Sequence, residues 1–396
     1  MSYLLVGALE KHDRERFEVI GVSLREAEDT ELGRRVTAAF DRMIDATALS
    51  DRQTAELLRE LEVDIAIDLM GLTQGMRLGI FAHRAAPVQV NYLGYAGTLG
   101  AEYIDYVLAD EVVVPSGQER WYAEKVIRLP HCFLPTDDKR AIGPAPSREQ
   151  AGLPAQGMVF CAFTNAYKIN PPVFDIWMRL LREVPQSVLW LRGMGAEART
   201  NVLREAAVRG VEAQRLVFAP HVASMAEHLA RHQLADLYLD TLPYNAHSTT
   251  CDALWAGVPV LTCMGRTFAS RVAASALTAV GLPELITQDL HEYERLALQL
   301  AREPGRLTEL RQRLAGRRLG AQPLAGHPVA EQTLAGLGGR SPLFDTDSYC
   351  QLLEGAYLDM HRLELRRRES HGLEPHGPEP HGPEPHGPDL HRIASA

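Results

Sequence analysis

The sequence predicts an α/β protein built from two units of parallel sheet. Short apolar runs of strand length recur along the chain, and segments with helical spacing of apolar residues separate them. Turns that carry Gly, Pro or Asn follow several of the apolar runs. This alternation is typical of βαβ units, in which neighbouring strands are parallel and the crossovers are right-handed.

Length and composition agree with a soluble globular protein. The 396 residues suffice for two or three domains with their own cores, and the 46% hydrophobic and 23% charged residues are ordinary values. A formal net charge of −10 gives no electrostatic basis for binding to nucleic acid or anionic lipid. We see no apolar run of transmembrane length and no signal peptide. We therefore expect a cytoplasmic protein with no nucleic-acid partner and no membrane.

The cysteines predict neither disulfides nor a metal site. No C-x-x-C pair or other paired metal spacing occurs among the five of them, which are Cys132, Cys161, Cys251, Cys263 and Cys350. Free thiols in a reducing compartment are the expected state.

The first alternating unit is predicted over residues 1–140. Its expected helices are 2–12, 30–42 and 51–61, and its expected strands are 17–24, 65–70, 88–93, 106–109 and 125–129. A doubly wound sheet usually opens on a strand, whereas this unit opens on a helix, so we expect it to be incomplete. After the strand 88–93, the glycines of Leu93-Gly94-Tyr95-Ala96-Gly97 allow the backbone to approach a ligand closely.

A polar, proline-bearing stretch at 136–156 is predicted as a linker, and a second alternating unit follows at 156–315. Its expected strands are 158–163, 187–191, 215–219, 234–239 and 258–263, and its expected helices are 172–184, 195–208, 223–231, 248–257, 269–279, 290–302 and 304–315.

Three further segments follow the second unit. Residues 316–340 are rich in Gly, Ala and Arg with little periodicity, so we expect an insertion loop, and 341–366 should contain a C-terminal helix. In 367–396 a His-Gly pentad with Pro repeats, which predicts a disordered tail. Histidines at that spacing could bind a transition metal weakly, but a low-complexity tail without a ligand is the favoured interpretation.

The most informative stretch is 234–259. Its apolar run ends at Asp240, a turn follows, and Ser248 and Thr249 open a helical segment that ends at Gly257. In a parallel sheet such a loop lies at the carboxyl end of a strand, where ligands bind. The first N–H groups of a helix lack intrahelical partners and lie at the positive end of its dipole, which suits a phosphate. We therefore predict a diphosphate cradle here.

Ordinary structural roles compete with this interpretation. Thr249 could be only an N-cap, with Asp252 completing a capping box. Lys168 follows the first strand of the second unit, where a lysine can serve as a point charge for a phosphate, although surface lysines are commoner. His221, His228 and His232 follow the third strand, and an imidazole there could stack on a base or simply face solvent.

Several motifs, in order, resemble the O-linked N-acetylglucosamine transferase family, which includes the SPINDLY proteins. They are APVQVNYLGYAGT at 86–98, IDY at 104–106, NAYKI at 165–169, PYNAHSTTCDALWAGVP at 243–259, GRTFASRVA at 265–273 and SPLFDT at 341–346. The resemblance covers residues 2–315 and 341–362. It implies a GT-B glycosyltransferase with two Rossmann-like domains, the first incomplete, and an inverting, metal-independent transfer from a nucleotide sugar to Ser or Thr hydroxyls.

The resemblance also implies roles for particular residues. Lys168 and His247 would be catalytic, with Lys168 and Asn165 at the diphosphate and His247 at the sugar. The remaining donor-binding residues would be His228 on uracil, Ser248 and Thr249 at the helix cradle, Asp252 on the ribose, and Leu93 and Gly94 from the first domain. The resemblance thus favours Asp252 as a ribose ligand over a capping partner. UDP-GlcNAc would be the donor substrate, with no other cofactor.

Three functions remain open from the sequence. The first is a protein O-GlcNAc transferase, which the Tyr167-Lys168 pair and the Asn245-Ala246-His247 segment favour. The second is a SPINDLY-type O-fucosyltransferase that uses GDP-fucose. The third is a catalytically impaired nucleotide-sugar-binding scaffold, because the family's first strand and a His-bearing segment, which would precede the helix starting at Ser2, are absent from this sequence.

Overall fold

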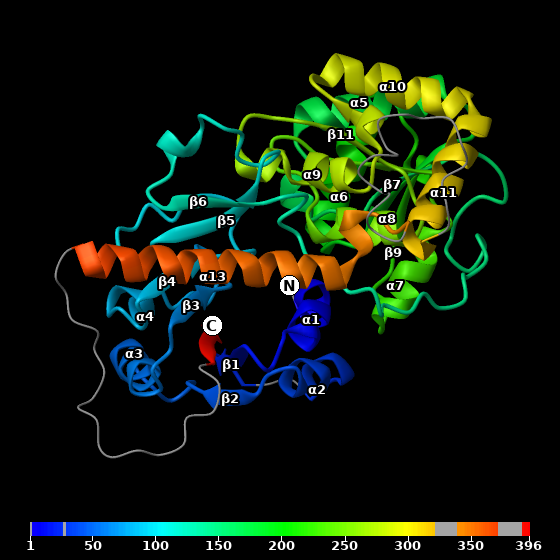
Figure 1. The fold of residues 1–396 in the computed structure, drawn as a ribbon. Coiled ribbons are helices and arrows are strands. Elements are labelled where there is room, and N and C mark those ends of the chain that lie inside the picture. Colours follow the sequence, from blue (N-terminus) through cyan, green and yellow to red (C-terminus); the bar gives the residue numbers. More distant parts are fainter. Residues whose placement is uncertain (1, 27–28, 321–338, 371–389) are drawn as a thin grey trace. The chain divides into compact units, whose positions relative to one another are not determined.

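The computed structural model describes residues 2–26, 29–320, 339–370 and 390–396, which fall into two compact units (Figure 1). One unit contains Met1–Asp137 and Thr346–Ala396, and the other contains Asp138–Asp345. Each unit contains helices and one parallel sheet, so the predicted α/β class is confirmed. Within the described ranges, no helix combines the length and the apolar character needed to cross a bilayer.

The first unit has a seven-stranded sheet in the order β2-β1-β13-β3-β4-β5-β6, in which all neighbours are parallel. The strands are β1 (Phe17–Ser23), β2 (Arg42–Asp45), β3 (Ile65–Asp68), β4 (Val88–Asn91), β5 (Tyr106–Asp110), β6 (Lys125–Leu129) and β13 (His391–Ser395). The helices are α1 (Ser2–Lys11), α2 (Glu31–Ala38), α3 (Asp51–Glu60), α4 (Gly79–Ala82) and α13 (Thr346–Ser370). The sequence does not predict β2, because this edge strand is mostly exposed and lacks a periodic apolar pattern.

The second unit has a six-stranded parallel sheet in the order β12-β11-β10-β7-β8-β9. The strands are β7 (Val159–Ala162), β8 (Val188–Arg192), β9 (Leu216–Ala219), β10 (Leu237–Leu239), β11 (Val260–Cys263) and β12 (Ile286–Thr287). The helices are α5 (Pro171–Glu183), α6 (Ala196–Val208), α7 (Met225–His232), α8 (Ser248–Trp255), α9 (Val272–Ala279), α10 (Leu290–Arg302) and α11 (Pro304–Leu319).

Local sequence explains why these elements form. All residues of β7, β10 and β11 are buried, which accounts for their continuous apolar runs, because the strands of a parallel sheet are covered on both faces. The helix α5 begins after Asn170, whose side-chain oxygen accepts a hydrogen bond from the Val173 N–H at 3.2 Å, and Pro171 occupies the first turn, where its missing N–H costs nothing.

The C-terminal part of the chain differs from the prediction of a disordered tail over 367–396. Residues 367–370 belong to α13, which packs beside α1 in the first unit (Figure 1). Residues 391–395 form β13 in the interior of the first sheet, so the prediction is wrong for them, whereas 371–389 lie outside the described residues. The strand is a five-residue segment beside a Gly- and Pro-rich repeat, and only its pairing with distant strands makes it regular.

The segment predicted as an insertion loop, 316–340, also begins in a helix. The helix α11 extends to Leu319 and ends at Gly320, whose φ of 75° is a left-handed conformation that favours glycine. Most of the remainder, 321–338, lies outside the described residues.

Candidate functional site

The predicted site residues of the second unit gather where the strand order reverses. Strands β7, β8 and β9 follow one another towards one edge of the sheet, and β10, β11 and β12 towards the other. The loops after β7 and β10 therefore leave the sheet next to each other at its carboxyl edge, which is where open α/β sheets bind ligands. The β7 loop carries Asn165 and Lys168, and the β10 loop leads into α8.

The buried carboxylate of Asp240 holds the β10 loop in shape. One of its oxygens accepts hydrogen bonds from the backbone N–H groups of Thr241 at 2.7 Å and Ala246 at 2.6 Å. The other accepts a hydrogen bond from the Thr262 hydroxyl at 2.6 Å. Burial raises the pKa of Asp240 to about 7, although these hydrogen bonds and the nearby Lys168 oppose that increase. The loop that precedes α8 is thus fixed before any ligand arrives.

Lys168 lies against this loop. Its ammonium group donates a hydrogen bond to the Asn245 carbonyl at 2.8 Å and lies 3.9 Å from the centre of the Tyr244 ring. Burial lowers the pKa of Lys168 to about 8, and the charge of Asp240 partly offsets this effect. The Lys168 side chain is therefore largely protonated at neutral pH. It is held at Asn245, which precedes the first residue of α8 by three positions.

The N-terminus of α8 presents free donors. In the part of the chain that the structure describes, the backbone N–H groups of Ser248 and Thr249 have no hydrogen-bond acceptor. His247 occupies the N-cap position without a capping side-chain bond, so the alternative in which Thr249 is the N-cap is wrong. The Thr249 hydroxyl instead accepts a hydrogen bond from the Tyr238 hydroxyl at 3.4 Å. Two free amides and a nearby ammonium group form an arrangement suited to an anion.

His247 is a neutral imidazole with a defined tautomer. Its Nε2 lies 3.1 Å from the Ala269 carbonyl, which can only accept, so Nε2 carries the proton and Nδ1 is an acceptor. Burial lowers the pKa of His247 to about 3, and the positive charge of Lys168 acts in the same direction. The ring stacks on Tyr244 with centroids 4.8 Å apart. It can therefore accept a hydrogen bond from a ligand hydroxyl but does not act as an acid at neutral pH.

Asp252 and His228 form a second group with Arg140. A guanidinium nitrogen of Arg140 donates a hydrogen bond to Asp252 at 2.7 Å, and both side chains are buried. The Nε2 of His228 lies 3.7 Å from the other Asp252 oxygen, and its Nδ1 accepts a hydrogen bond from Arg231 at 2.6 Å. Burial alone raises the pKa of Asp252, but His228 and the Arg140 guanidinium outweigh it, so the pKa lies below its usual value and Asp252 is ionised.

Sequence reasoning missed two residues of the site. Arg140 lies in the stretch predicted as a linker, 112 residues before Asp252, and nothing local predicts that they pair. Tyr244, which contacts both Lys168 and His247, stands inside a recognisable motif, so a search for aromatic residues beside the predicted lysine could have found it.

The remaining predicted residues are Asn165, Leu93 and Gly94. Asn165 is exposed, and its side-chain oxygen accepts a hydrogen bond from Arg192 at 2.7 Å. Leu93 and Gly94 belong to the first unit, where they follow β4 at the carboxyl edge of that sheet. Leu93 has a φ of 66°, a left-handed conformation that is rare for a leucine and is found mainly where the surrounding structure imposes it.

One group of described residues has the composition of a metal site, and it lies in the first unit. Ligand atoms of His12, Cys350 and Glu354 lie within 4.8 Å of one another. Two of these residues contact each other, because the Nδ1 of His12 lies 3.0 Å from a carboxylate oxygen of Glu354. The same oxygen accepts a hydrogen bond from the Asp13 N–H at 2.8 Å. These contacts connect the end of α1 with α13.

Comparisons with known proteins agree with the geometry. The family model described as glycosyl transferase family 41 matches residues 1–144 and 144–326. The chain is 35% identical over 370 residues to a probable UDP-N-acetylglucosamine–peptide N-acetylglucosaminyltransferase, SEC, of Arabidopsis thaliana, an alignment that covers 92% of this chain and 36% of that protein. It is 31% identical to a protein of Petunia hybrida with the same description, SPINDLY, over 91% of this chain and 37% of that one. The chain thus spans little more than a third of these relatives.

Comparison with solved structures also identifies an O-GlcNAc transferase. An O-GlcNAc transferase mutant of Thermobaculum terrenum superposes with a TM-score of 0.79 at 32% identity, over 92% of this chain and 65% of that one. The Anabaena protein HepE, solved with UDP, superposes with a TM-score of 0.52 at 12% identity, over 87% of this chain and all of that one. The second similarity is one of fold alone.

Proposed function

The chain belongs to glycosyltransferase family 41, and on that premise we propose that it is an inverting enzyme that moves N-acetylglucosamine from UDP-GlcNAc to Ser and Thr hydroxyls of proteins. The observation that carries the proposal is the placement of Lys168 beside the N-terminus of α8. A protonated ammonium group and two free backbone amides lie at the strand-order reversal of the second sheet, the position where such sheets bind nucleotides.

The chemistry follows from where charge develops. When the bond between the sugar and UDP breaks, the bonding electrons go to the departing diphosphate. Lys168 and the amides of Ser248 and Thr249 are fixed in advance to stabilise that charge, so they act mainly in the transition state. In this proposal they do so without a metal ion.

The other residues would hold the rest of the donor. Asp252 is kept ionised by Arg140 and can accept hydrogen bonds from ribose hydroxyls. His228 is oriented by Arg231 and offers a ring face to uracil, and the Nδ1 of His247 can accept a hydrogen bond from a sugar hydroxyl. We place Asn165 at the diphosphate. We also place the reaction in the reducing cytoplasm, because all five cysteines are free and buried.

The direct test is transfer of radiolabelled N-acetylglucosamine from UDP-GlcNAc to a Ser/Thr-containing peptide. We expect label on the peptide and, more slowly, hydrolysis of the donor. Donor hydrolysis without peptide labelling would restrict the proposal to the donor half of the reaction. If neither occurs and UDP still binds, the chain is a nucleotide-sugar-binding scaffold.

The choice between donors can be made by thermal shift. A ligand that binds only the folded state raises the melting temperature, and at 100 times its dissociation constant it stabilises that state by about 2.7 kcal/mol. We expect UDP to raise the melting temperature by several degrees and GDP to raise it less. A shift with GDP and none with UDP would instead support a SPINDLY-type enzyme that uses GDP-fucose.

The affinity for UDP should depend on pH through Lys168. The ammonium attracts the diphosphate only while protonated, and its pKa in the free protein is about 8. UDP should therefore bind roughly tenfold more weakly at pH 9 than at pH 7, because only about a tenth of the lysine is then protonated. Isothermal titration at the two pH values measures this, with Lys168→Met as the matched control that should lose the difference. If the affinity for UDP changes equally with pH in both proteins, the pH dependence belongs to another group.

A further inference from the structure

The interior of the first sheet contains a strand that comes from a distant part of the chain. Strands β1 and β3 do not pair with each other, because β13 lies between them (Figure 1). Five residues of β13 are in register with β1, from Phe17 opposite His391 to Gly21 opposite Ser395, and three are in register with β3. Without this strand, both neighbours would expose unpaired backbone groups inside the sheet, which is costly.

Backbone hydrogen bonds hold the segment along its whole length. The His391 N–H donates to the Arg16 carbonyl at 2.9 Å, and the Asp64 N–H donates to the Arg392 carbonyl at 2.9 Å. At the other end, the Ala396 N–H donates to the Ile67 carbonyl at 3.0 Å. Bonds of this kind recognise an extended main chain whatever its side chains are.

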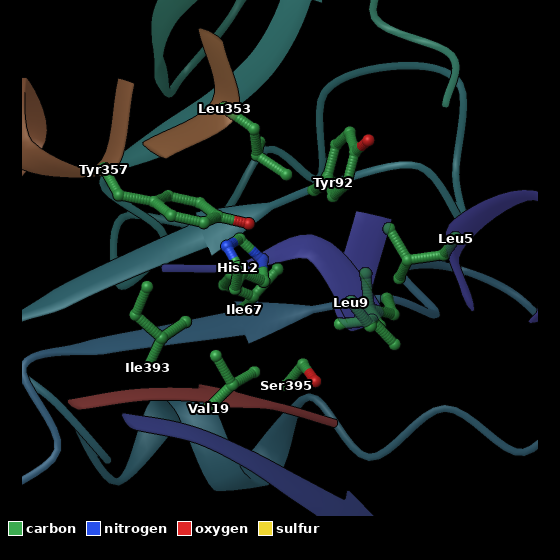
Figure 2. Close-up of a pocket in the computed structure, with 11 residues that line it drawn as sticks. Leu5, Leu9, His12, Val19, Ile67, Tyr92, Leu353, Tyr357, Ile393 and Ser395 are labelled. Atoms are coloured by element: carbon green, nitrogen blue, oxygen red, sulfur yellow. The ribbon is translucent and has the colours of Figure 1, made fainter. Parts of the chain in front are cut away.

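Two apolar side chains give the segment its fit. Ile393 and Ala394 are each 2% exposed, and as neighbours in a strand they lie on opposite faces of the sheet. Ile393 borders a small cavity together with Leu9 and Tyr357 (Figure 2). Ala394 is part of the core on the other face, with Ile20 and Ala66. The segment therefore presents a large and a small apolar side chain, in that order, to the two buried faces of the sheet.

Charge adds a third element of recognition. The Arg392 guanidinium lies 3.1 Å from a carboxylate oxygen of Glu18, in β1, and 2.8 Å from one of Glu62, which precedes β3. Its backbone N–H donates a hydrogen bond to the Asp64 carboxylate at 2.8 Å. Two carboxylates thus contact the Arg392 guanidinium, and a third accepts a hydrogen bond from its backbone.

We propose that the gap between β1 and β3 is a binding site for an extended peptide with the pattern basic, large apolar, small. The chain fills it with its own residues 390–396, and the same segment can bind there as a separate chain, including one from a second copy. Every contact described above is made by the segment itself, so the same contacts can form when the segment belongs to a separate chain.

The test uses the full chain with a protease site engineered between 376 and 385. After cleavage of the folded protein, we expect the C-terminal fragment to co-elute with the body on gel filtration. A fluorescent synthetic peptide of residues 390–396, LHRIASA, should then exchange with it saturably. A scrambled peptide of the same composition should bind at least tenfold more weakly, as should the Ile393→Asp peptide.

Three results would overturn the proposal. They are loss of the fragment on cleavage without binding of the added peptide, retention of the fragment without any exchange, and equal binding of the scrambled peptide. A second variant, ending at Ser370, gives an independent measurement, because added LHRIASA should raise its melting temperature saturably. All of these readouts are independent of sugar transfer, so they stand or fall separately from the proposed enzyme activity.

Discussion

Lys168→Ala should lower the rate of sugar transfer by roughly two orders of magnitude or more, because removal of one preorganised donor at a developing negative charge costs about 3 kcal/mol. The fold should survive the change. Burial lowers the pKa of Lys168, so the charged side chain is less well solvated in the folded protein than in water, and its removal relieves that cost. The effect should appear in kcat and in kcat/KM, since the interaction strengthens mainly in the transition state.

The control for this experiment is Lys125→Ala, an exposed lysine at the start of β6 in the first unit. It removes the same charge from the protein and should leave transfer within about twofold of the parent, as expected for a surface substitution away from the site. Melting temperatures of both variants should lie close to that of the parent. If Lys168→Ala retains full turnover, Lys168 has no part in the reaction and the anion site has been placed wrongly.

Arg140→Met should destabilise the second unit by about 3–5 kcal/mol, because it leaves the ionised carboxylate of Asp252 buried without its charged partner. Arg140 also lies over the Trp255 ring, 5.2 Å from its centre, so methionine is chosen to retain part of that packing. The hydrogen bond from the Trp255 indole to the Arg140 backbone carbonyl does not depend on the side chain and should persist. Urea denaturation measures the change in the free energy of unfolding.

Asp252→Asn provides the comparison for a double-mutant cycle. It removes the charge that Arg140 neutralises, so the double variant should lose less stability than the sum of the two single variants, with a coupling of about 1–3 kcal/mol. Simple additivity would mean that the two side chains do not stabilise each other. Both single variants should also weaken UDP binding, because Asp252 is proposed to contact the ribose.

Local patterns predicted most of the fold, and the exceptions have physical causes. Continuous apolar runs such as that of β7 mark strands buried on both faces, and the amphipathic pattern of α5 marks its core-facing side. The edge strand β2 is largely exposed and has no such pattern, and β13 is too short to be distinguished from its repeat-rich surroundings. Both depend on pairing with strands distant in sequence, which no local window contains.

The site was predictable to the extent that it is local. The residues Lys168, His247, Ser248 and Thr249 stand in two short motifs after neighbouring strands, and the structure places them around one loop. The Arg140–Asp252 ion pair joins segments far apart in sequence, and the support of the loop by buried Asp240 depends on Thr262 of β11. Neither relation has a signature in a single sequence, so both required the fold.

The position of β13 also sets an order for biosynthesis. The second unit is continuous in sequence, so its sheet can be completed while the ribosome is still adding later residues. The first sheet cannot be completed until β13 is synthesised, which happens after all of Asp138–Asp345. Pairing between such distant segments is intrinsically slow to form. We therefore expect nascent chains stalled before 390 to contain a protease-resistant second unit and a first unit that is still open to digestion.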